Sequence, residues 1–246
     1  MADFTIELSK LNIGVSSIYD YSEKFCEKYL TNAKPDFSVR TTEEKIDKEI
    51  EISEFTPKRD YAESICLYRE IAEIIPNYDR CVFHGACIEY EGAGFIFTAV
   101  SGTGKSTHIR LWQKFLGSDK VQIINGDKPI LHVGEEGTTI YSTPYAGKEG
   151  WQNHSSAPLK AICLLKRGKE NKIYRVASSD IITDIFNQIY RPYDTAAVIK
   201  TLELLDRLLK LPVYILECDI SEEAVKTSFE TLTGLSYEDR KLKNEN

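Results

Sequence analysis

The stretch Ser101-Gly102-Thr103-Gly104-Lys105-Ser106-Thr107 decides the fold class of this 246-residue chain. It directly follows the apolar run Gly94-Phe95-Ile96-Phe97 and precedes a run of helical composition that ends at Leu111-Trp112. A strand, a glycine-rich turn, a Lys-Ser pair and a helix, in that order, are typical of a phosphate-binding P-loop. Glycines let backbone N–H groups converge on phosphate oxygens, and the helix N-terminus adds a favourable dipole. The stretch therefore predicts binding of a nucleoside triphosphate.

Each part of the predicted P-loop has an expected role toward ATP and Mg²⁺. The backbone of residues 101–107 cradles the phosphates, Lys105 reaches the β- and γ-phosphates, and the hydroxyl of Ser106 binds Mg²⁺. The complete motif begins with a glycine, where this chain has Ala99. A glycine-rich hairpin turn is the alternative, but it gives no reason for a lysine and a serine between a strand and a helix. The pattern therefore favours phosphate binding.

Composition and charge favour a soluble protein, for which a cytoplasmic location is expected. The net charge is −7, with acids and bases interspersed, which argues against a nucleic-acid partner because such a partner favours a basic face. No apolar stretch approaches the ~20 residues that span a bilayer, and residues 1–4 lack the pattern of a signal peptide. The 6 cysteines include no CxxC pair and are expected to be buried, reduced thiols. We expect neither nucleic acid nor membrane as a partner.

The order of the predicted elements indicates an α/β protein built around a mixed sheet. Apolar periodicity, caps and breakers define the elements, among them a capping box of Thr41 and Glu44. Strands are predicted at 4–8, 36–40, 81–90, 95–98, 121–124, 130–133, 138–142, 160–165 and 213–216. Helices are predicted at 21–30, 42–52, 60–75, 105–116, 194–210 and 221–233, and from 178 or 179 to a point before Pro192.

The same signals divide the chain into three parts. Residues 1–78 are predicted to form an N-terminal α+β layer, which is not marked as an independent domain. Residues 79–236 form the predicted ATP-binding domain, and residues 237–246 form a polar tail.

Asp127 is the candidate metal ligand. A P-loop enzyme needs an acidic side chain at the end of a neighbouring strand, to hold the metal directly or through water. Asp127 meets this need because it follows the apolar pair Ile123-Ile124, a helix and a strand after Lys105. Asn125-Gly126-Asp127 is also a strong turn signal. Because a turn and a metal ligand can share residues, the pattern favours a ligand role over a plain turn.

Two other segments hold candidate site residues. The loop 143–151 contains two glycines, two aromatics and Lys148, whose charge could reach a transferring phosphoryl group or could simply be solvated; the sequence leaves both open. His84 lies in the predicted strand before the P-loop and has, on spacing alone, the pattern of a structural histidine. His108 and His132 are expected to be packing or surface residues.

A longer set of positions carries a family resemblance. In order and without a gap, the chain has His84-Gly85, Gly92, Gly94, Thr98 and then the P-loop stretch. This set resembles the catalytic domain of HPr kinase/phosphorylase, and the Ser-Gly-Thr-Gly-Lys sequence is also similar to phosphoenolpyruvate carboxykinase. Residues 125–150 resemble small HPr-kinase-like proteins with an Asn-Asp-Asp-Lys-Pro motif and a Thr-Pro-Trp-x-Gly-Lys loop. The resemblance covers residues 80–165 best and implies a mixed-sheet P-loop kinase domain of this type.

The resemblance also implies roles for single residues. In that family the histidine before the loop hairpin belongs to the active site, which implies a catalytic role for His84. Asp127 matches the second acid of the family's Asp-Asp pair, whereas Gly126 stands at the first acid, a candidate base for the attacking hydroxyl. Proton removal would then rest on Asp127 or His84 alone. The kinase relatives are often oligomeric, which leaves a homo-oligomer open.

These expectations combine into one hypothesis with two alternatives. The hypothesis is a Mg²⁺-dependent kinase that transfers the γ-phosphoryl group of ATP to a serine-type hydroxyl of a peptide or small protein, with Lys148 neutralising developing charge. One alternative is a nucleotide sensor without phosphotransfer, motivated by Gly126; the other is a small-molecule kinase whose acceptor is free serine or a similar hydroxyl compound. The N-terminal layer could recognise the acceptor or only cover the sheet.

Overall fold

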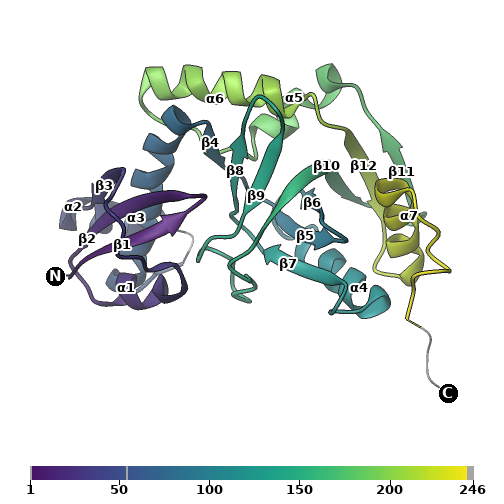
Figure 1. Ribbon diagram of the computed structural model, residues 1–246, viewed down its shortest axis with the longest axis horizontal. Coiled ribbons are helices and arrows are strands. Elements are labelled where there is room, and N and C mark those ends of the chain that lie inside the picture. The colour runs from purple at the N-terminus through teal and green to yellow at the C-terminus, as the bar shows by residue number, and fades with distance from the viewer. Residues whose placement is uncertain (1, 54, 243–246) are drawn as a thin grey trace.

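The computed structural model describes residues 2–53 and 55–242 and contains two β-sheets with helices packed on them (Figure 1). The first part of the chain forms a 3-stranded sheet, and the rest forms a 9-stranded sheet with both parallel and antiparallel pairs. This arrangement confirms the predicted mixed α/β fold class. Within the described ranges, no helix is both long and apolar enough to cross a membrane.

The small sheet begins with a hairpin that the predicted elements lack. It holds β1 (Ala2–Leu8), β2 (Leu11–Ser17) and β3 (Phe37–Arg40), with β1 antiparallel and β3 parallel to β2. Ser9 and Lys10 turn the chain between β1 and β2 with φ angles of 53° and 60°. Glycine and asparagine are the residues that predict such turns, and neither is present here, so the sequence gives only a weak signal for the hairpin.

Helices cover the small sheet. They are α1 (Tyr21–Phe25), the 3₁₀ helix η1 (Glu27–Tyr29), α2 (Glu43–Ile52), α3 (Arg59–Ile74) and the 3₁₀ helix η2 (Ile75–Tyr78). The predicted helix 21–30 is therefore two short ones that meet at Cys26. The N-cap of α2 is Thr42 and not Thr41, because the Thr42 hydroxyl accepts a hydrogen bond from the backbone N–H of Lys45 at 3.3 Å.

The large sheet is branched at its longest strand, β10 (Ser156–Arg167). One path runs through β4 (Arg80–Val82), β8 (Ile130–Val133), β9 (Thr138–Tyr141), β10, β6 (Ala93–Thr98), β5 (Ala86–Tyr90) and β7 (Val121–Asn125). The later part of β10 also pairs in parallel with β12 (Val213–Cys218), which carries the antiparallel edge strand β11 (Lys172–Arg175). β11 is a second strand that the predicted elements lack.

The predicted strand 81–90 is two strands, β4 and β5, that lie in different parts of the sheet. Three residues between them leave the ladder and bond to loops instead. The backbone N–H groups of Phe83, His84 and Gly85 donate to the carbonyls of Pro129, Gln188 and Asp127 at 3.0, 2.7 and 2.8 Å. These tertiary contacts, which no local pattern encodes, fix His84 and Gly85 beside Asp127.

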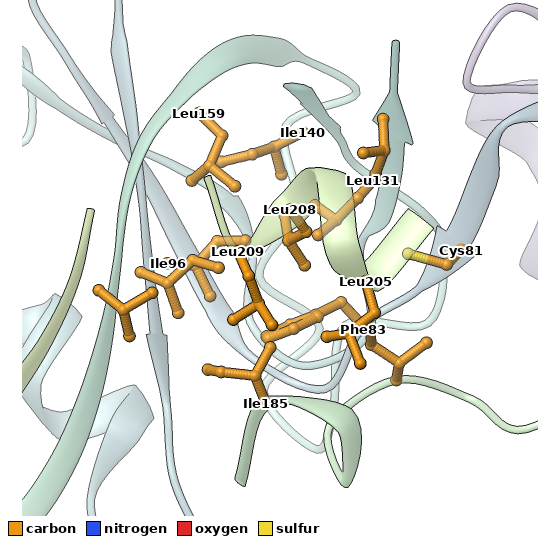
Figure 2. Packing of buried hydrophobic residues seen from close by; sticks show 14 of the residues in the cluster. Cys81, Phe83, Ile96, Leu131, Ile140, Leu159, Ile185, Leu205, Leu208 and Leu209 are labelled. Carbon is orange, nitrogen blue, oxygen red and sulfur yellow. The ribbon is translucent and has the colours of Figure 1, made fainter. Parts of the chain in front are cut away.

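Helices pack on both faces of the large sheet, so its central strands are buried on both sides. They are α4 (Lys105–Leu116), α5 (Ser178–Phe186), α6 (Thr195–Leu208) and α7 (Glu222–Thr233). Ile96 of β6 and Leu159 of β10 pack in a core that includes Ile185 of α5 and Leu208 of α6 (Figure 2). Phe95 and Phe97, the neighbours of Ile96, point to the other core, against α4 and α7. The alternation follows from the two-residue period of a strand.

The N-terminal layer shares a third core with the large sheet. Ile71 and Ile75, from α3 and η2, cluster with Val82 of β4 and Ile130 of β8. The division of the chain at residue 78 remains a prediction. At the other end, Tyr237, the first residue of the predicted tail, is buried against Phe229, and residues 243–246 lie outside the described residues.

α4 is anchored by a buried polar contact. His108 is 3% exposed, its Nε2 lies 3.0 Å from the Ser228 hydroxyl of α7, and its ring packs edge-on against Phe97. The indole N–H of Trp112 donates to the same hydroxyl at 3.0 Å. Burial lowers the pKa of His108 from 6.5 to about 3, so the imidazole is neutral in the folded protein.

This pKa makes stability depend on pH. Between pH 6.5 and about 3 the unfolded chain binds a proton at His108 that the folded chain does not, so stability falls as the pH falls. Going from neutral pH to about pH 5, this residue should lower the free energy of unfolding by about 2 kcal/mol. His108→Gln, which cannot titrate, should lose that part of the dependence in urea unfolding at the two pH values. An equal change in the free energy of unfolding between the two pH values in both proteins would contradict the assignment of this pH dependence to His108.

Candidate functional site

Strand direction brings five loops to one edge of the large sheet. β6, β7, β10 and β12 run in one direction, because β10 is parallel to β6 and β12 while β5 is antiparallel to both β6 and β7. The segment before β5 and the segments after the other four strands therefore meet at the same edge. In open α/β sheets, ligands bind outside the carboxyl ends of the strands, and this edge is that place.

The segment 99–104 after β6, here called the glycine loop, needs glycine at two positions. Gly102 and Gly104 have φ angles of 76° and 123°, in the region that favours glycine. The backbone N–H and the hydroxyl of Thr103 both donate to the Val100 carbonyl, at 3.2 and 2.8 Å. The chain then enters α4 directly, so the loop ends at a helix N-terminus.

Lys105, the first residue of α4, folds back over the glycine loop. Its ammonium group donates to the Ala99 carbonyl at 3.1 Å, and the residue is only 8% exposed. Burial lowers the pKa of Lys105, while the negative charge of Asp127 opposes that shift. The lysine thus lies in the field of Asp127, and within residues 2–53 and 55–242 the Ala99 carbonyl is its one hydrogen-bond partner.

Arg167 holds the glycine loop from the neighbouring strand. It is the last residue of β10, and its guanidinium group donates to the carbonyls of Gly102 at 2.6 Å and Thr103 at 3.4 Å. Arg167 is absent from the predicted site. The signal that could have found it is the Lys-Arg pair that ends the apolar run 160–165, since the parallel pairing of β10 with β6 places that end beside the loop.

Asn125, at the end of β7, builds the turn that presents Asp127. Its side chain is fully buried, and its carbonyl oxygen accepts from the backbone N–H groups of Asp127 and Lys128, both at 2.8 Å. Its amide nitrogen donates to the carbonyl and hydroxyl of Thr143 at 3.0 and 3.1 Å. The turn signal at 125–127 therefore describes a real turn, and that turn fixes an acidic side chain at the sheet edge.

Asp127 has basic neighbours on two sides. Its Oδ1 lies 3.4 Å from His84 Nε2, and its Oδ2 lies 3.9 Å from Lys128 Nζ. Burial acts to raise the pKa of Asp127, but the interaction with His84 and the charges of Lys128 and Lys105 outweigh it, so the pKa lies below its usual value. The carboxylate is therefore ionised at neutral pH.

The predicted site residues, with one exception, line a single cleft of about 410 Å³, here called the phosphate cleft. Lys148, which is exposed, enters it from the loop after β9. Thr103 is the exception and lines a second cleft of about 380 Å³ on the other side of the glycine loop, with Arg167 and His108. The predicted residues in the phosphate cleft are His84, Ser101, Gly102, Gly104, Lys105, Ser106, Thr107, Asp127 and Lys148.

The donor set of the phosphate cleft suits a magnesium ion bound together with phosphates. Ser106 contributes a hydroxyl and Asp127 a carboxylate, both hard oxygen ligands. In the described part of the chain no three His, Cys, Asp or Glu side chains are grouped to hold a metal by themselves. Mg²⁺ normally takes one or two protein carboxylates and completes its shell with waters and substrate phosphates, so the set present fits that use.

Gly126 has a steric reason to be glycine. A Cβ built on it would lie 2.8 Å from the carbonyl oxygen of Ala146, which is backbone and cannot swing away. The backbone N–H of Gly126 donates to the Trp151 carbonyl at 2.9 Å, so the middle and the last residue of the loop 143–151 both lie against this residue. An aspartate here would have to displace that loop.

Comparisons with known proteins find only distant similarity. No family model matches the chain, and no curated protein matches it. Among solved structures, 47 chains match. One of them, the Hpr(Ser) kinase/phosphatase from Coxiella burnetii, aligns with 13% identity and a TM-score of 0.30 over 52% of this chain and 90% of that chain. At this level of similarity, neither a residue role nor a function is carried over to this chain.

The contact at Gly126 can be tested with a matched pair of glycines. Gly126→Ala should destabilise the protein by about 1–3 kcal/mol, because the new methyl group overlaps a fixed carbonyl. Gly134→Ala is the control, since its Cβ would lie 3.4 Å from the nearest atom, an ordinary contact, and neither glycine has a positive φ. Urea unfolding should separate the two variants. Equal stability of the two variants would contradict the steric account.

Proposed function

We propose that the protein is a Mg²⁺-dependent phosphotransferase that moves the γ-phosphoryl group of ATP to a serine-type hydroxyl of a peptide or small protein. The observation that carries the proposal is the convergence of Lys105, Ser106 and Asp127 on one cleft beside a glycine loop at a helix N-terminus. Phosphoryl transfer needs mainly positioning and charge stabilisation, and these groups supply both.

The glycine loop and Lys105 are assigned to the nucleotide. The N–H groups of the loop and of the first turn of α4 face the phosphate oxygens, and Lys105 exchanges the Ala99 carbonyl for the β- and γ-phosphates. Ser106 and Asp127 would hold Mg²⁺, which when bound would neutralise charge on the phosphates. The second cleft, lined by His108 and Arg167, is where the nucleoside would extend.

Asp127 is assigned to the acceptor hydroxyl. Its carboxylate, ionised at neutral pH, accepts the hydroxyl proton as the acceptor oxygen forms its bond to the γ-phosphorus. The bond from that phosphorus to the β–γ bridging oxygen breaks, and ADP leaves with the bridging oxygen. His84 would keep the carboxylate oriented, and Lys148, which lines the same cleft, would neutralise charge that develops on the transferring group.

A nucleotide sensor without phosphotransfer is the second candidate, and one observation favours it. Gly126 stands at the first acid of the resembled motif, and its contact with Ala146 leaves no room for a side chain. Under this alternative, Mg-ATP binds in the phosphate cleft and no ADP forms with any acceptor. The small-molecule kinase differs from the proposed peptide kinase only in the acceptor.

Nucleotide turnover separates these candidates. ADP release from Mg-ATP should rise when an extract of the source cell's small proteins is added, and it should fall at least about 100-fold in Lys105→Ala, because one transition-state charge partner is lost. Lys114→Ala, at the far end of the same helix, is the matched control and should turn over as the wild type does. Asp127→Asn should bind nucleotide and lose transfer.

Two results would count against the kinase. Undiminished transfer in Lys105→Ala would reject the assigned cleft, and tight Mg-ATP binding without ADP in the presence of the extract would favour the sensor.

A further inference from the structure

A pocket of about 350 Å³ lies directly beside the phosphate cleft and is here called the aromatic pocket. His84, Asp127 and Gly147 line both the phosphate cleft and the aromatic pocket. A group held in the aromatic pocket and a phosphoryl group held at the glycine loop therefore meet at the Asp127 carboxylate. The volume is at the low end of the ~300–1,000 Å³ of small-molecule sites, which suits one ring-sized group.

The N-terminal layer supplies one wall of the aromatic pocket. Phe25 comes from α1, and Tyr61, Ile65 and Tyr68 come from one face of α3. The loop after β9 contributes Pro144, Tyr145 and Ala146 to the lining of the same pocket. The layer is thus in place to touch whatever approaches Asp127 from the side away from the nucleotide.

The aromatic part of the lining offers ring surface, because the hydroxyls of Tyr68 and Tyr145 are already bonded; Arg69, Lys128 and Gln188 also line the pocket. The rings of Tyr68 and Tyr145 stack with centroids 3.8 Å apart, and Phe25 meets Tyr145 edge-on at 5.1 Å. The Tyr68 hydroxyl donates to the Lys128 carbonyl at 2.8 Å, and the Tyr145 hydroxyl donates to the Ser64 carbonyl at 2.7 Å. What these residues offer an occupant is ring surface, which prefers another flat, apolar group.

We propose that the aromatic pocket holds an apolar, ring-sized group of the hydroxyl acceptor, next to the hydroxyl that Asp127 deprotonates, and that the N-terminal layer is the acceptor-recognition part of the protein. This inference rests on the proposed phosphotransferase function. The hydroxyl loses its proton to Asp127, its oxygen bonds to the γ-phosphorus, and ADP leaves. Free serine has no apolar group to place against these rings, so we expect it to be a poorer acceptor than a compound that carries one.

The same chemistry can come from two sources, a free alcohol with an apolar body or a peptide in which an apolar residue adjoins a serine. Three probes separate them: 2-phenylethanol, the peptide N-acetyl-Ser-Phe-amide, and N-acetyl-Ser-Gly-amide as the peptide without an apolar neighbour. The wild type should use one or both aromatic probes with a kcat/KM at least about tenfold above that of the glycine peptide. Transfer to 2-phenylethanol alone points to a free compound, and transfer to the phenylalanine peptide alone points to a peptide.

Ile65→Trp tests the pocket, because a larger side chain at this half-buried position fills it. It should abolish the preference for aromatic probes and leave Mg-ATP binding unchanged. Ile52→Trp makes the same change at an exposed position of the same layer and should behave as the wild type. If Ile65→Trp does not fold, Tyr61→Ala is the second variant. It removes part of the wall at a side chain that is 37% exposed, and it should also weaken the preference for aromatic probes.

Binding of 2-phenylethanol can be measured by ligand-observed NMR in the absence of nucleotide. This measurement tests the pocket independently of catalysis. Binding to the wild type that is lost in Ile65→Trp supports the pocket even where no transfer occurs, and in that case only the phosphotransferase proposal fails. Absence of binding of both 2-phenylethanol and N-acetyl-Ser-Phe-amide to the wild type at millimolar concentration overturns the inference. So does equal use of the phenylalanine and glycine peptides, and so does a preference that Ile65→Trp leaves intact.

Discussion

The direction of β6 relative to its neighbours is the constraint on which the site depends. β6 is buried on both faces and pairs in parallel with β10 and antiparallel with β5, which in turn is antiparallel to β7. Reversing β7 or β10 relative to β6 would send Asp127 or Arg167 to the opposite edge of the sheet. Because His84, Asp127 and Arg167 lie at the edge where β6 ends, the glycine loop meets a carboxylate, its histidine and a guanidinium clamp.

Burial of the central strands makes this arrangement rigid. Neighbouring residues of β6 enter different cores, so a one-residue slip of register would exchange every contact of Phe95, Ile96 and Phe97. Asn125 adds a second restraint, because its side chain bonds both the turn at Asp127 and the loop that begins at Thr143. The acid is thus held from the sheet and from the loop together.

Much of the fold and of the phosphate cleft could be predicted from local sequence patterns. The strand, glycine loop and helix around Lys105 are contiguous in the chain, and Asp127 follows its strand directly, so each could be predicted from its neighbours. β2 was missed because Ser9 and Lys10 turn the chain without a glycine. The break between β4 and β5 was missed because distant carbonyls draw Phe83 and Gly85 out of the ladder.

What sequence reasoning could not reach depends on contacts between distant segments. Arg167 meets Gly102 only through the pairing of β10 with β6. The aromatic pocket joins Tyr68 of the N-terminal layer to Tyr145, residues that no local period connects. The carbonyl of Ala146, which explains glycine at 126, comes from a loop two strands later. In each case the sequence shows the chemistry of the residue but does not show which distant residue it contacts.

A crystal structure of the wild type with Mg²⁺ and a non-hydrolysable ATP analogue tests the central claim most directly. The account predicts that the phosphates lie on the backbone of 101–105 with the Lys105 ammonium group moved from the Ala99 carbonyl to the β- and γ-phosphates. It also predicts Mg²⁺ bound by Ser106 and, directly or through water, by Asp127. Phosphates bound outside this cleft, or a Lys105 that stays on Ala99 with nucleotide present, would contradict it.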